Sequence, residues 1–310
     1  MSTLPVIAAV DGSDDSLRAL EWALTAARLR EAPLRAVHVR QYAVGAQPDV
    51  LVAGPPDPAD DPVLDEARAY LDGRPGKPVI EYLGLPDRPA VEYVAMVGAP
   101  AAVLPELGAS AQLLVLGSRG RGGFAGLVLG SNGMAAARDA DCPVVVVPRI
   151  GREVPDPPPV DPGPRVVVGL HVDGPDETAL AFAFTEAARR GARVQVIAAY
   201  PWPVRTWTAA GDFVPGTFDQ AAVEGETRTL AEGFVGPHQE RHPDLRVDLY
   251  VPPGDAAGHL VAASKDAALV VVGRHRRRLL APARLMGSVT QAVLLHAASP
   301  VAVVPPRQED

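Results

Sequence analysis

The sequence predicts an α/β protein made of two domains in tandem, each a parallel sheet flanked by helices. The chain of 310 residues is longer than one hydrophobic core usually supports, which indicates about two domains. A proline-rich run at 148–164 divides the chain near its midpoint, and proline excludes a helix interior or a central strand there. On both sides the same alternation of apolar strand and amphipathic helix recurs, which indicates an internal duplication with parallel sheets.

We therefore expect a first domain at 1–148, a proline-rich linker at 149–164 and a second domain at 165–310. In the first domain the apolar runs predict strands at Val6–Val10, Leu34–Arg40, Leu113–Leu116 and Val144–Val147. Helical periodicity predicts helices at Asp14–Arg30, Val63–Leu71 and Ser131–Asp139. Continuous apolar strands such as VVVV indicate burial on both faces of the sheet.

The third strand of the first domain has two candidates. Segments 79–90 and 91–102, VIEYLGLPDRPA and VEYVAMVGAPAA, look like one strand-and-turn unit written twice. We favour the second segment as the strand, because GAPAAVLPEL follows it directly as the start of a helix.

The second domain repeats this order of elements. Its expected strands are Val166–Leu170, Val194–Tyr200, Leu245–Val251, Leu269–Val272 and Val301–Val304. Its expected helices are Asp176–Arg190, one around Gln220–Phe234, Asp255–Ala263 and Ser288–Ala297.

Composition excludes several classes of protein. A formal net charge of −8 gives no general electrostatic reason to approach nucleic acid or an anionic membrane. The single cysteine, Cys142, excludes an intramolecular disulfide and is expected to be a buried, inert thiol in a reducing compartment. We expect neither an export signal nor a membrane span, and therefore a cytoplasmic location. The seven histidines have no metal-ligand or triad spacing, so we expect no metal site and no catalytic residue.

A glycine-rich loop between a strand and a helix carries the strongest functional signal. Gly117 and Gly120 are separated by two residues, and nine more residues lead to Gly130 and Ser131. We expect a glycine at the strand end to adopt positive φ and to let a phosphate approach the backbone. At Gly130 and Ser131 free helix N–H groups and a hydroxyl can meet an anion, and Arg119 and Arg121 could neutralise its charge. The alternative is a flexible surface loop.

This spacing resembles the ATP-binding loop of universal stress proteins, in the form of a tandem pair of domains, and the resemblance covers nearly all of both halves. It implies Rossmann-like domains with five-stranded sheets of order 3-2-1-4-5. By resemblance, Ala9, Val10 and Asp11 would line the adenosine, with the Asp11 carboxylate accepting a ribose hydroxyl, and Val39 would lie beside the adenine. The phosphates would be held by Gly117, Gly120, Gly130 and Ser131, with Asn132 offering a further amide. The alternative for Asp11 is a turn or N-cap aspartate.

The second copy departs from this pattern. Aligning the halves without gaps puts His171 opposite Asp11 and Ala199 near Val39. The second-domain candidates are Gly273, Arg276, Gly287 and Ser288, with arginine at the second glycine and a spacing one residue longer. The basic run at 274–278 could bind phosphate, an acidic partner or RNA, or could be a solvated loop.

The resemblance implies an ATP-binding regulatory protein of the stress response, with or without Mg²⁺. Nucleotide would be held mainly in the first domain, without catalysis or with slow hydrolysis. The last strands of the two domains would pair as an internal pseudo-dimer, two chains could pair further as a homodimer, and a protein partner is implied but not identified. Two alternatives remain open: a weak ATPase, and a nucleotide-independent interaction module.

Overall fold

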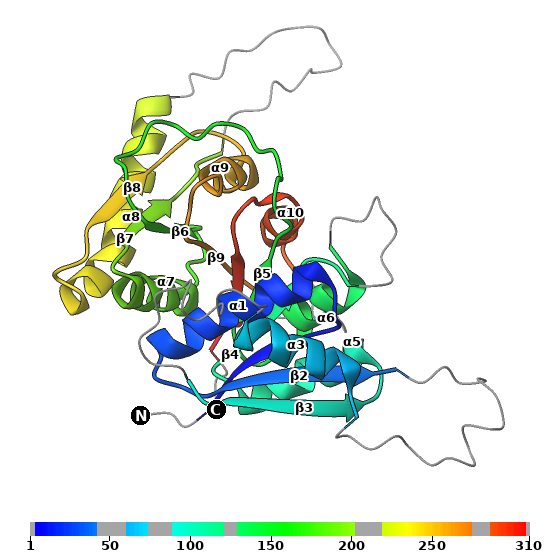
Figure 1. The fold of residues 1–310 in the computed structure, drawn as a ribbon. Coiled ribbons are helices and arrows are strands. Elements are labelled where there is room, and N and C mark those ends of the chain that lie inside the picture. The colour runs from blue at the N-terminus through cyan, green and yellow to red at the C-terminus, as the bar shows by residue number, and fades with distance from the viewer. Residues whose placement is uncertain are drawn as a thin grey trace, which may run out of the picture.

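The computed structural model describes residues 4–41, 60–73, 89–120, 129–201, 219–274 and 286–307 (Figure 1). In the first half the strands are β1 (Val6–Ala9), β2 (Leu34–Arg40), β3 (Val91–Val97), β4 (Leu113–Gly117) and β5 (Val144–Val147). The helices of that half are α1 (Asp14–Leu29), α3 (Pro62–Asp72), α5 (Pro100–Leu107) and α6 (Ser131–Asp139), and α5 ends in a short 3₁₀ turn, η1 (Gly108–Ser110).

The second half follows the same order. Its strands are β6 (Arg165–Gly169), β7 (Arg193–Ile197), β8 (Val247–Tyr250), β9 (Leu269–Gly273) and β10 (Val301–Val304). Its helices are α7 (Glu177–Arg190), α8 (Gln220–Arg241), α9 (Ala256–Ala263) and α10 (Ser288–His296). None of the helices in these described ranges is long and apolar enough to cross a membrane.

All the named strands form one sheet with the order β3-β2-β1-β4-β5-β10-β9-β6-β7-β8. Each half therefore has the expected order 3-2-1-4-5, and its strands are parallel. The halves are joined by antiparallel pairing of β5 with β10, in which Ala302 lies opposite Val145. The expected pairing through the last strands is confirmed.

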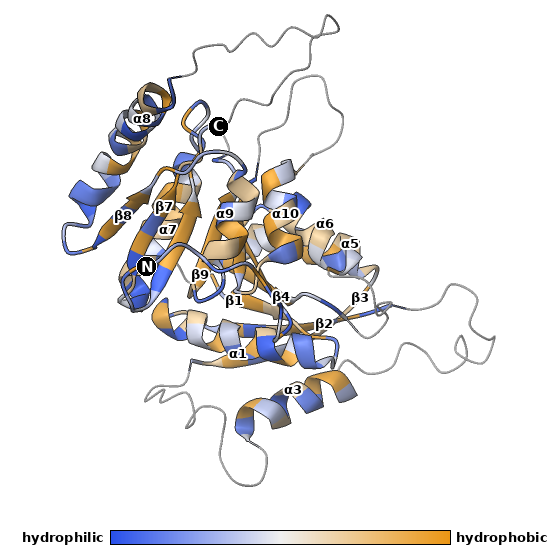
Figure 2. Ribbon diagram, turned by 90° about the horizontal axis from the view of Figure 1, so that it is seen from above, coloured by the Kyte–Doolittle hydropathy of each residue, from blue (hydrophilic) through white to orange (hydrophobic). Residues whose placement is uncertain are grey.

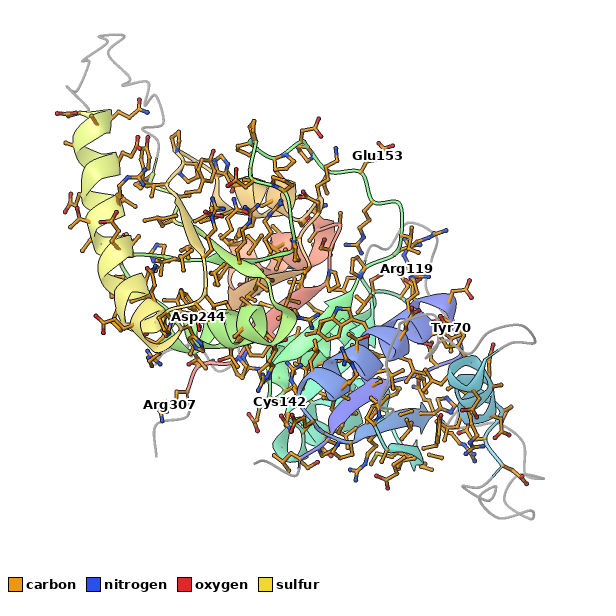
Figure 3. The ribbon with its side chains drawn as sticks, turned by 60° about the vertical axis from the view of Figure 1, so that its left-hand side comes forward. Tyr70, Arg119, Cys142, Glu153, Asp244 and Arg307 are labelled. Carbon is orange, nitrogen blue, oxygen red and sulfur yellow. The ribbon has the colours of Figure 1, made fainter. Side chains whose placement is uncertain are left out.

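Antiparallel joining places the carboxyl ends of the strands of the two halves at opposite ends of the sheet. Arg119 follows β4 and Cys142 precedes β5, so they lie at opposite ends of these two parallel strands, and Figure 3 shows them well apart. Arg307, which follows β10, lies at the same end as Cys142. The carboxyl strand ends of one half consequently face away from those of the other.

Two helical layers cover the sheet (Figure 2). Helices α1, α3, α7 and α8 pack on one face and α5, α6, α9 and α10 on the other. Successive residues of the central strands alternate between the two layers: Val145 and Val147 face the first, and Val144 and Val146 the second. Each apolar cluster contains residues from both halves, so burial is continuous across the junction.

Helices α1 and α7 meet at this junction through buried charges. Arg30 Nη2 lies 2.6 Å from Glu186 Oε1, and the two side chains are 2% and 0% exposed. Glu186 also pairs with Arg189 at 3.1 Å and with Arg190 at 3.4 Å. The Arg190 guanidinium lies 4.7 Å from the ring centre of Trp22 on α1. The Glu186 carboxylate thus forms ion pairs with three arginines at the seam between the halves.

The structure settles which duplicated segment enters the sheet. Strand β3 begins at Val91 and pairs with β2 along its length, which confirms the second segment, while most of the first segment lies outside the described residues. The predicted end of the helix around Phe234 is wrong, because α8 continues through Pro237 to Arg241. Val235 and His238 are buried there, and the His238 ring lies 5.3 Å from that of Phe184, so packing outweighs the helix-breaking residues.

The expected burial of Cys142 is confirmed. Its side chain is buried, and burial raises the pKa of the thiol to about 12. A thiol with this pKa remains protonated at neutral pH and is a poor nucleophile. Within the described ranges no cluster of histidine, cysteine and acidic side chains could hold a metal ion.

Candidate nucleotide site

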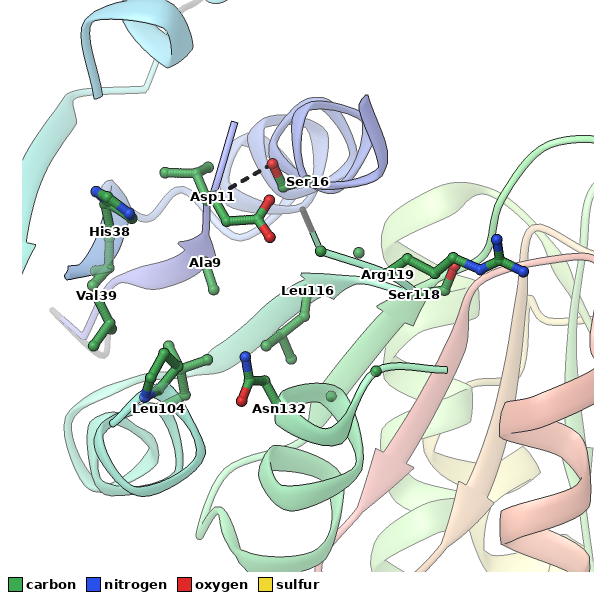
Figure 4. A pocket seen from close by; sticks show the side chains of 17 residues that line it. Ala9, Asp11, Ser16, His38, Val39, Leu104, Leu116, Ser118, Arg119 and Asn132 are labelled. Carbon is green, nitrogen blue, oxygen red and sulfur yellow. Dashed lines mark hydrogen bonds between the residues drawn. The ribbon is translucent and has the colours of Figure 1, made fainter. Parts of the chain in front are cut away.

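A pocket that is open to solvent lies where β1 and β4 separate at their carboxyl ends (Figure 4). This is the point at which the strand order reverses, and open parallel sheets usually bind ligands there. Nine of the ten residues predicted for the first half line it: Ala9, Val10, Asp11, Val39, Gly117, Arg119, Gly120, Gly130 and Asn132. The tenth, Ser131, is exposed as the first residue of α6 and is not part of the lining.

One end of the pocket is apolar. Val37 and Val39 come from the end of β2, Leu116 from β4, and Pro100 and Leu104 from α5. Figure 4 shows Val39, Leu104 and Leu116 around the same space. The sequence did not reveal Pro100 and Leu104 as site residues, although GAPAAVLPEL directly after the third strand was a usable signal. This wall suits a flat aromatic base.

Asp11 follows β1 and makes a turn as well as lining the pocket. Its Oδ1 accepts hydrogen bonds from Ser13 N at 3.0 Å and Ser13 Oγ at 2.6 Å. Ser13 also caps α1, because its hydroxyl accepts from Ser16 N. The turn role considered for Asp11 is therefore present, and the same local bonds hold its carboxylate at the pocket.

The glycines of the loop are explained by the close packing of neighbouring atoms and not by unusual backbone angles. Gly117, Gly120 and Gly130 do not have positive φ, so the expected left-handed conformation at the strand end is wrong. A Cβ at Gly117 would lie 2.6 Å from the backbone of Asp15, and one at Gly120 would lie 2.3 Å from Asp11 Oδ2. The backbone of α1 therefore leaves no room for a side chain at Gly117, and at Gly120 a side chain would displace the Asp11 carboxylate.

Helix α6 begins at the edge of the pocket. Its N-cap is Gly130, and no side chain caps the helix. Gly130 N donates to Ser118 O at 2.9 Å, which fixes the loop end to the residue after β4. Asn132 and Gly133 from the first turn line the pocket, so the positive end of the helix dipole faces it.

Arg119 contributes to the pocket differently from the prediction. Its carbonyl accepts from Ser13 Oγ at 3.3 Å. In Figure 4 its side chain runs away from the pocket, toward the second half. Burial lowers the pKa of Arg152 between β5 and β6, and the positive charge of Arg119 lowers it further. Arg121 lies outside the described residues.

A polar cluster behind β2 fixes the strand that carries the apolar wall. His38 Nδ1 lies 2.7 Å from Asp61 Oδ2, and Arg40 Nε donates to the same oxygen at 2.8 Å. Asp61 is also the N-cap of α3. Burial raises the pKa of Asp61, but the hydrogen bonds from Arg40 and His38 outweigh burial and hold it below its usual value.

The registers of the two halves identify equivalent positions. Val6 lies opposite Leu34 and Val166 opposite Val194, so the gap-free alignment holds and His171, which is exposed, occupies the position of Asp11. Gly287 is the N-cap of α10 and Ser288 its first residue, as at Gly130 and Ser131.

Other parts of the second copy differ further. The residue after Ser288 is Val289, where the first half has Asn132. The carboxylate of Asp176 lies against Gly273, 2.2 Å from where a Cβ would be. Arg276 lies outside the described residues. The second half therefore keeps the glycine and the helix start and lacks the carboxylate and the amide of the first site.

Comparison with known proteins identifies the family. The model of the universal stress protein family matches residues 4–148 and, separately, 164–305. The chain belongs to the universal stress protein family. It is 36% identical over 301 residues to universal stress protein Rv2005c of Mycobacterium tuberculosis, covering 96% of each chain. It is 32% identical over 309 residues to a universal stress protein of Mycolicibacterium smegmatis, covering 97% of each.

Solved structures share the fold of the whole chain. A universal stress protein from Archaeoglobus fulgidus aligns with 98% of this chain and 99% of its own, at a TM-score of 0.62 and 17% identity. A universal stress protein solved in complex with cAMP aligns with 47% of this chain and 97% of its own, at 28% identity and a TM-score of 0.32.

Proposed function

We propose that the first half binds an adenine nucleotide, with ATP as the ligand, and that the protein is a nucleotide-binding regulator of the stress response. One observation carries the proposal: strand ends and a helix start that are far apart in sequence meet at one pocket, with an apolar wall, a carboxylate and an uncapped helix N-terminus. We also propose domain limits of 1–148 and 165–310, joined by the linker.

Each part of a nucleotide has a matching group in the pocket. The adenine would lie between Val39 and Leu104, where apolar side chains offer a flat wall. The ribose would meet Asp11, because a carboxylate that lines the pocket can accept a hydrogen bond from a hydroxyl. The phosphates would meet the first turn of α6, where Gly130 leaves the backbone open, since a Cβ there would have only Ser118 O at 3.8 Å.

We propose that the nucleotide is held rather than cleaved. Hydrolysis would need a group that orients water at the terminal phosphate, and Asp11 is engaged with Ser13 in a turn. The anionic phosphates would be met by the helix dipole, with Mg²⁺ supplying further charge neutralisation when it accompanies ATP. A phosphate-release assay with and without Mg²⁺ tests this directly: turnover well above the rate of free ATP would contradict it.

We propose one nucleotide per chain, because the second half has His171 and Val289 where the first has Asp11 and Asn132. Titration calorimetry with ATP tests this on matched variants. Asp11→Ala should weaken binding by about tenfold or more, as expected for the loss of a charged hydrogen bond. His171→Ala, at the equivalent exposed position, should leave both affinity and stoichiometry unchanged. Equal effects of the two substitutions would refute the assignment of the site to the first half.

We further propose a cytoplasmic location and a homodimer. The reduced, buried Cys142 is compatible with a reducing compartment. Since β5 and β10 pair within the chain, a homodimer would use another surface. Fractionation of cells and sedimentation of the purified protein test these two statements.

A further inference from the structure

The helix that begins at the nucleotide pocket is completed at its other end by an arginine of the second half. Arg274 directly follows β9, is 8% exposed, and its Nη1 donates to Ala140 O at 2.6 Å. Ala140 is the C-cap of α6. The two ends of α6 therefore meet different partners, the pocket of its own half at the N-terminus and the second half at the C-terminus.

An arginine also binds the C-terminal end of the equivalent helix of the second half, α10. Arg152 of the linker donates from Nη1 to Leu295 O and Ala297 O, both at 3.0 Å, and Ala297 is the C-cap of α10. Helices α6 and α10 lie next to each other on one face of the sheet (Figure 2). Antiparallel pairing of β5 with β10 brings the end of β9 to the turn between α6 and β5, so the contact by Arg274 follows from the topology.

The contact is specific to the second copy of the loop. Gly117 pairs with Val147 and Gly273 with Val304, so Arg274 occupies the position that Ser118 has in the first half. Ser118 Oγ donates to Asp15 Oδ2 and stays within its own half. At this equivalent position, Ser118 binds within the first half, whereas Arg274 of the second half binds across the junction to the first half.

The contact with Arg274 should stabilise α6, which is a short helix. Helix α6 has nine residues, and helices of this length depend on tertiary contacts for their stability. A cation at the helix C-terminus stabilises the carbonyl end of the dipole, as an anion does at the N-terminus. Because the N–H groups of the first turn keep their direction only while the helix is formed, a contact at Ala140 supports an anion site at Gly130.

We propose that Arg274 is a positioning residue for the nucleotide site of the first half, so that this site is complete only when the second half is docked. The inference rests on the proposed function, and it gives the degenerate second loop a role: it holds the phosphate-facing helix of its neighbour. The effect should fall on the phosphates, which would face α6 in the proposed binding mode, and not on the nucleoside, which would face the strand ends.

Calorimetric titration of ATP and of adenosine tests the proposal on three variants of the full chain. Arg274→Ser should weaken ATP binding by about fivefold and leave adenosine binding within about twofold of wild type. Arg274→Lys should recover most of the ATP affinity, because a cation returns to the end of α6. Arg246→Ser removes an equal charge from an exposed position of the second half and should change neither affinity.

The outcomes separate the two proposals. Wild-type protein that binds no ATP would contradict the proposed function. Wild-type binding with an unchanged affinity in Arg274→Ser would overturn the inference, as would equal losses for ATP and adenosine, which mark general damage. Should Arg274→Ser not fold, Arg274→Gln, which keeps amide donors and loses the charge, is judged by the same ratio of ATP to adenosine affinity.

Discussion

Replacing Glu186 with glutamine should destabilise the protein far more than loss of a typical ion pair. The Glu186 carboxylate is fully buried, and three arginines lie within 3.4 Å of it. Glutamine keeps the shape and one acceptor oxygen but removes the only negative charge among them. Breaking a buried ion pair on one side costs about 3–5 kcal/mol, because the remaining charge is left uncompensated. This is a large fraction of the roughly 5–15 kcal/mol that stabilises a domain.

Urea unfolding, followed by circular dichroism and by tryptophan fluorescence, measures this cost. Trp22 lies under the Arg190 guanidinium, so its emission should also change when the cluster is disturbed. The matched control is Asp65→Asn, which breaks an exposed pair with Arg68 and should cost no more than about 1 kcal/mol. Equal losses in the two variants would refute the view that the seam is held by a buried charge cluster.

Three further predictions concern the glycines, the thiol and acid stability. Gly117→Ala should destabilise the protein by about 1–3 kcal/mol, because the new methyl group would meet backbone atoms at 2.6 Å. Gly233→Ala on the open face of α8 should stabilise it by about 0.5–1 kcal/mol. Urea unfolding in which the two substitutions change the free energy of unfolding in the same direction would contradict this prediction. Cys142, with its pKa raised to about 12, should react with iodoacetamide at pH 8 only after unfolding, and rapid labelling of the native protein would be inconsistent with its burial. The pKa of Asp61 is lowered on folding, so this residue contributes stability above its unfolded pKa of about 3.9, and the contribution is lost as the pH falls below that value. Asp61→Asn should therefore flatten the decline in the free energy of unfolding between about pH 5 and pH 3. An unchanged decline would exclude this contribution.

Much of the fold follows from apolar periodicity and repetition. Runs such as VVVV at β5 are strands that are buried on both faces, and the halves repeat the same order of elements, so the parallel sheets were predictable. The end of α8 was not, because Gly236 and Pro237 indicate a helix stop, while the burial of His238 against α7 is a tertiary effect. The buried role of Glu186 was equally hidden, since its partner Arg30 lies in the other half.

Site residues were predictable from the sequence where they lie directly at the end of a strand or the start of a helix. Gly130 caps the start of α6, Ser131 is its first residue, and Asp11 follows β1, as their positions between elements indicated. The reason for the glycines was not predictable, because Gly117 and Gly120 are set by the approach of α1 and Asp11 from elsewhere in the chain. The direction of the Arg119 side chain, which runs away from the pocket, was not predictable either, because the sequence does not encode the direction of a loop side chain.

A crystal structure of the full chain grown with ATP tests the central claim most directly. We predict density for one nucleotide in the first half, with its base between Val39 and Leu104, its ribose at Asp11 and its phosphates at Gly130. The equivalent region near His171 and Gly287 should contain none. Nucleotide bound in the second half alone, or in neither half at saturating ATP, would contradict the claim.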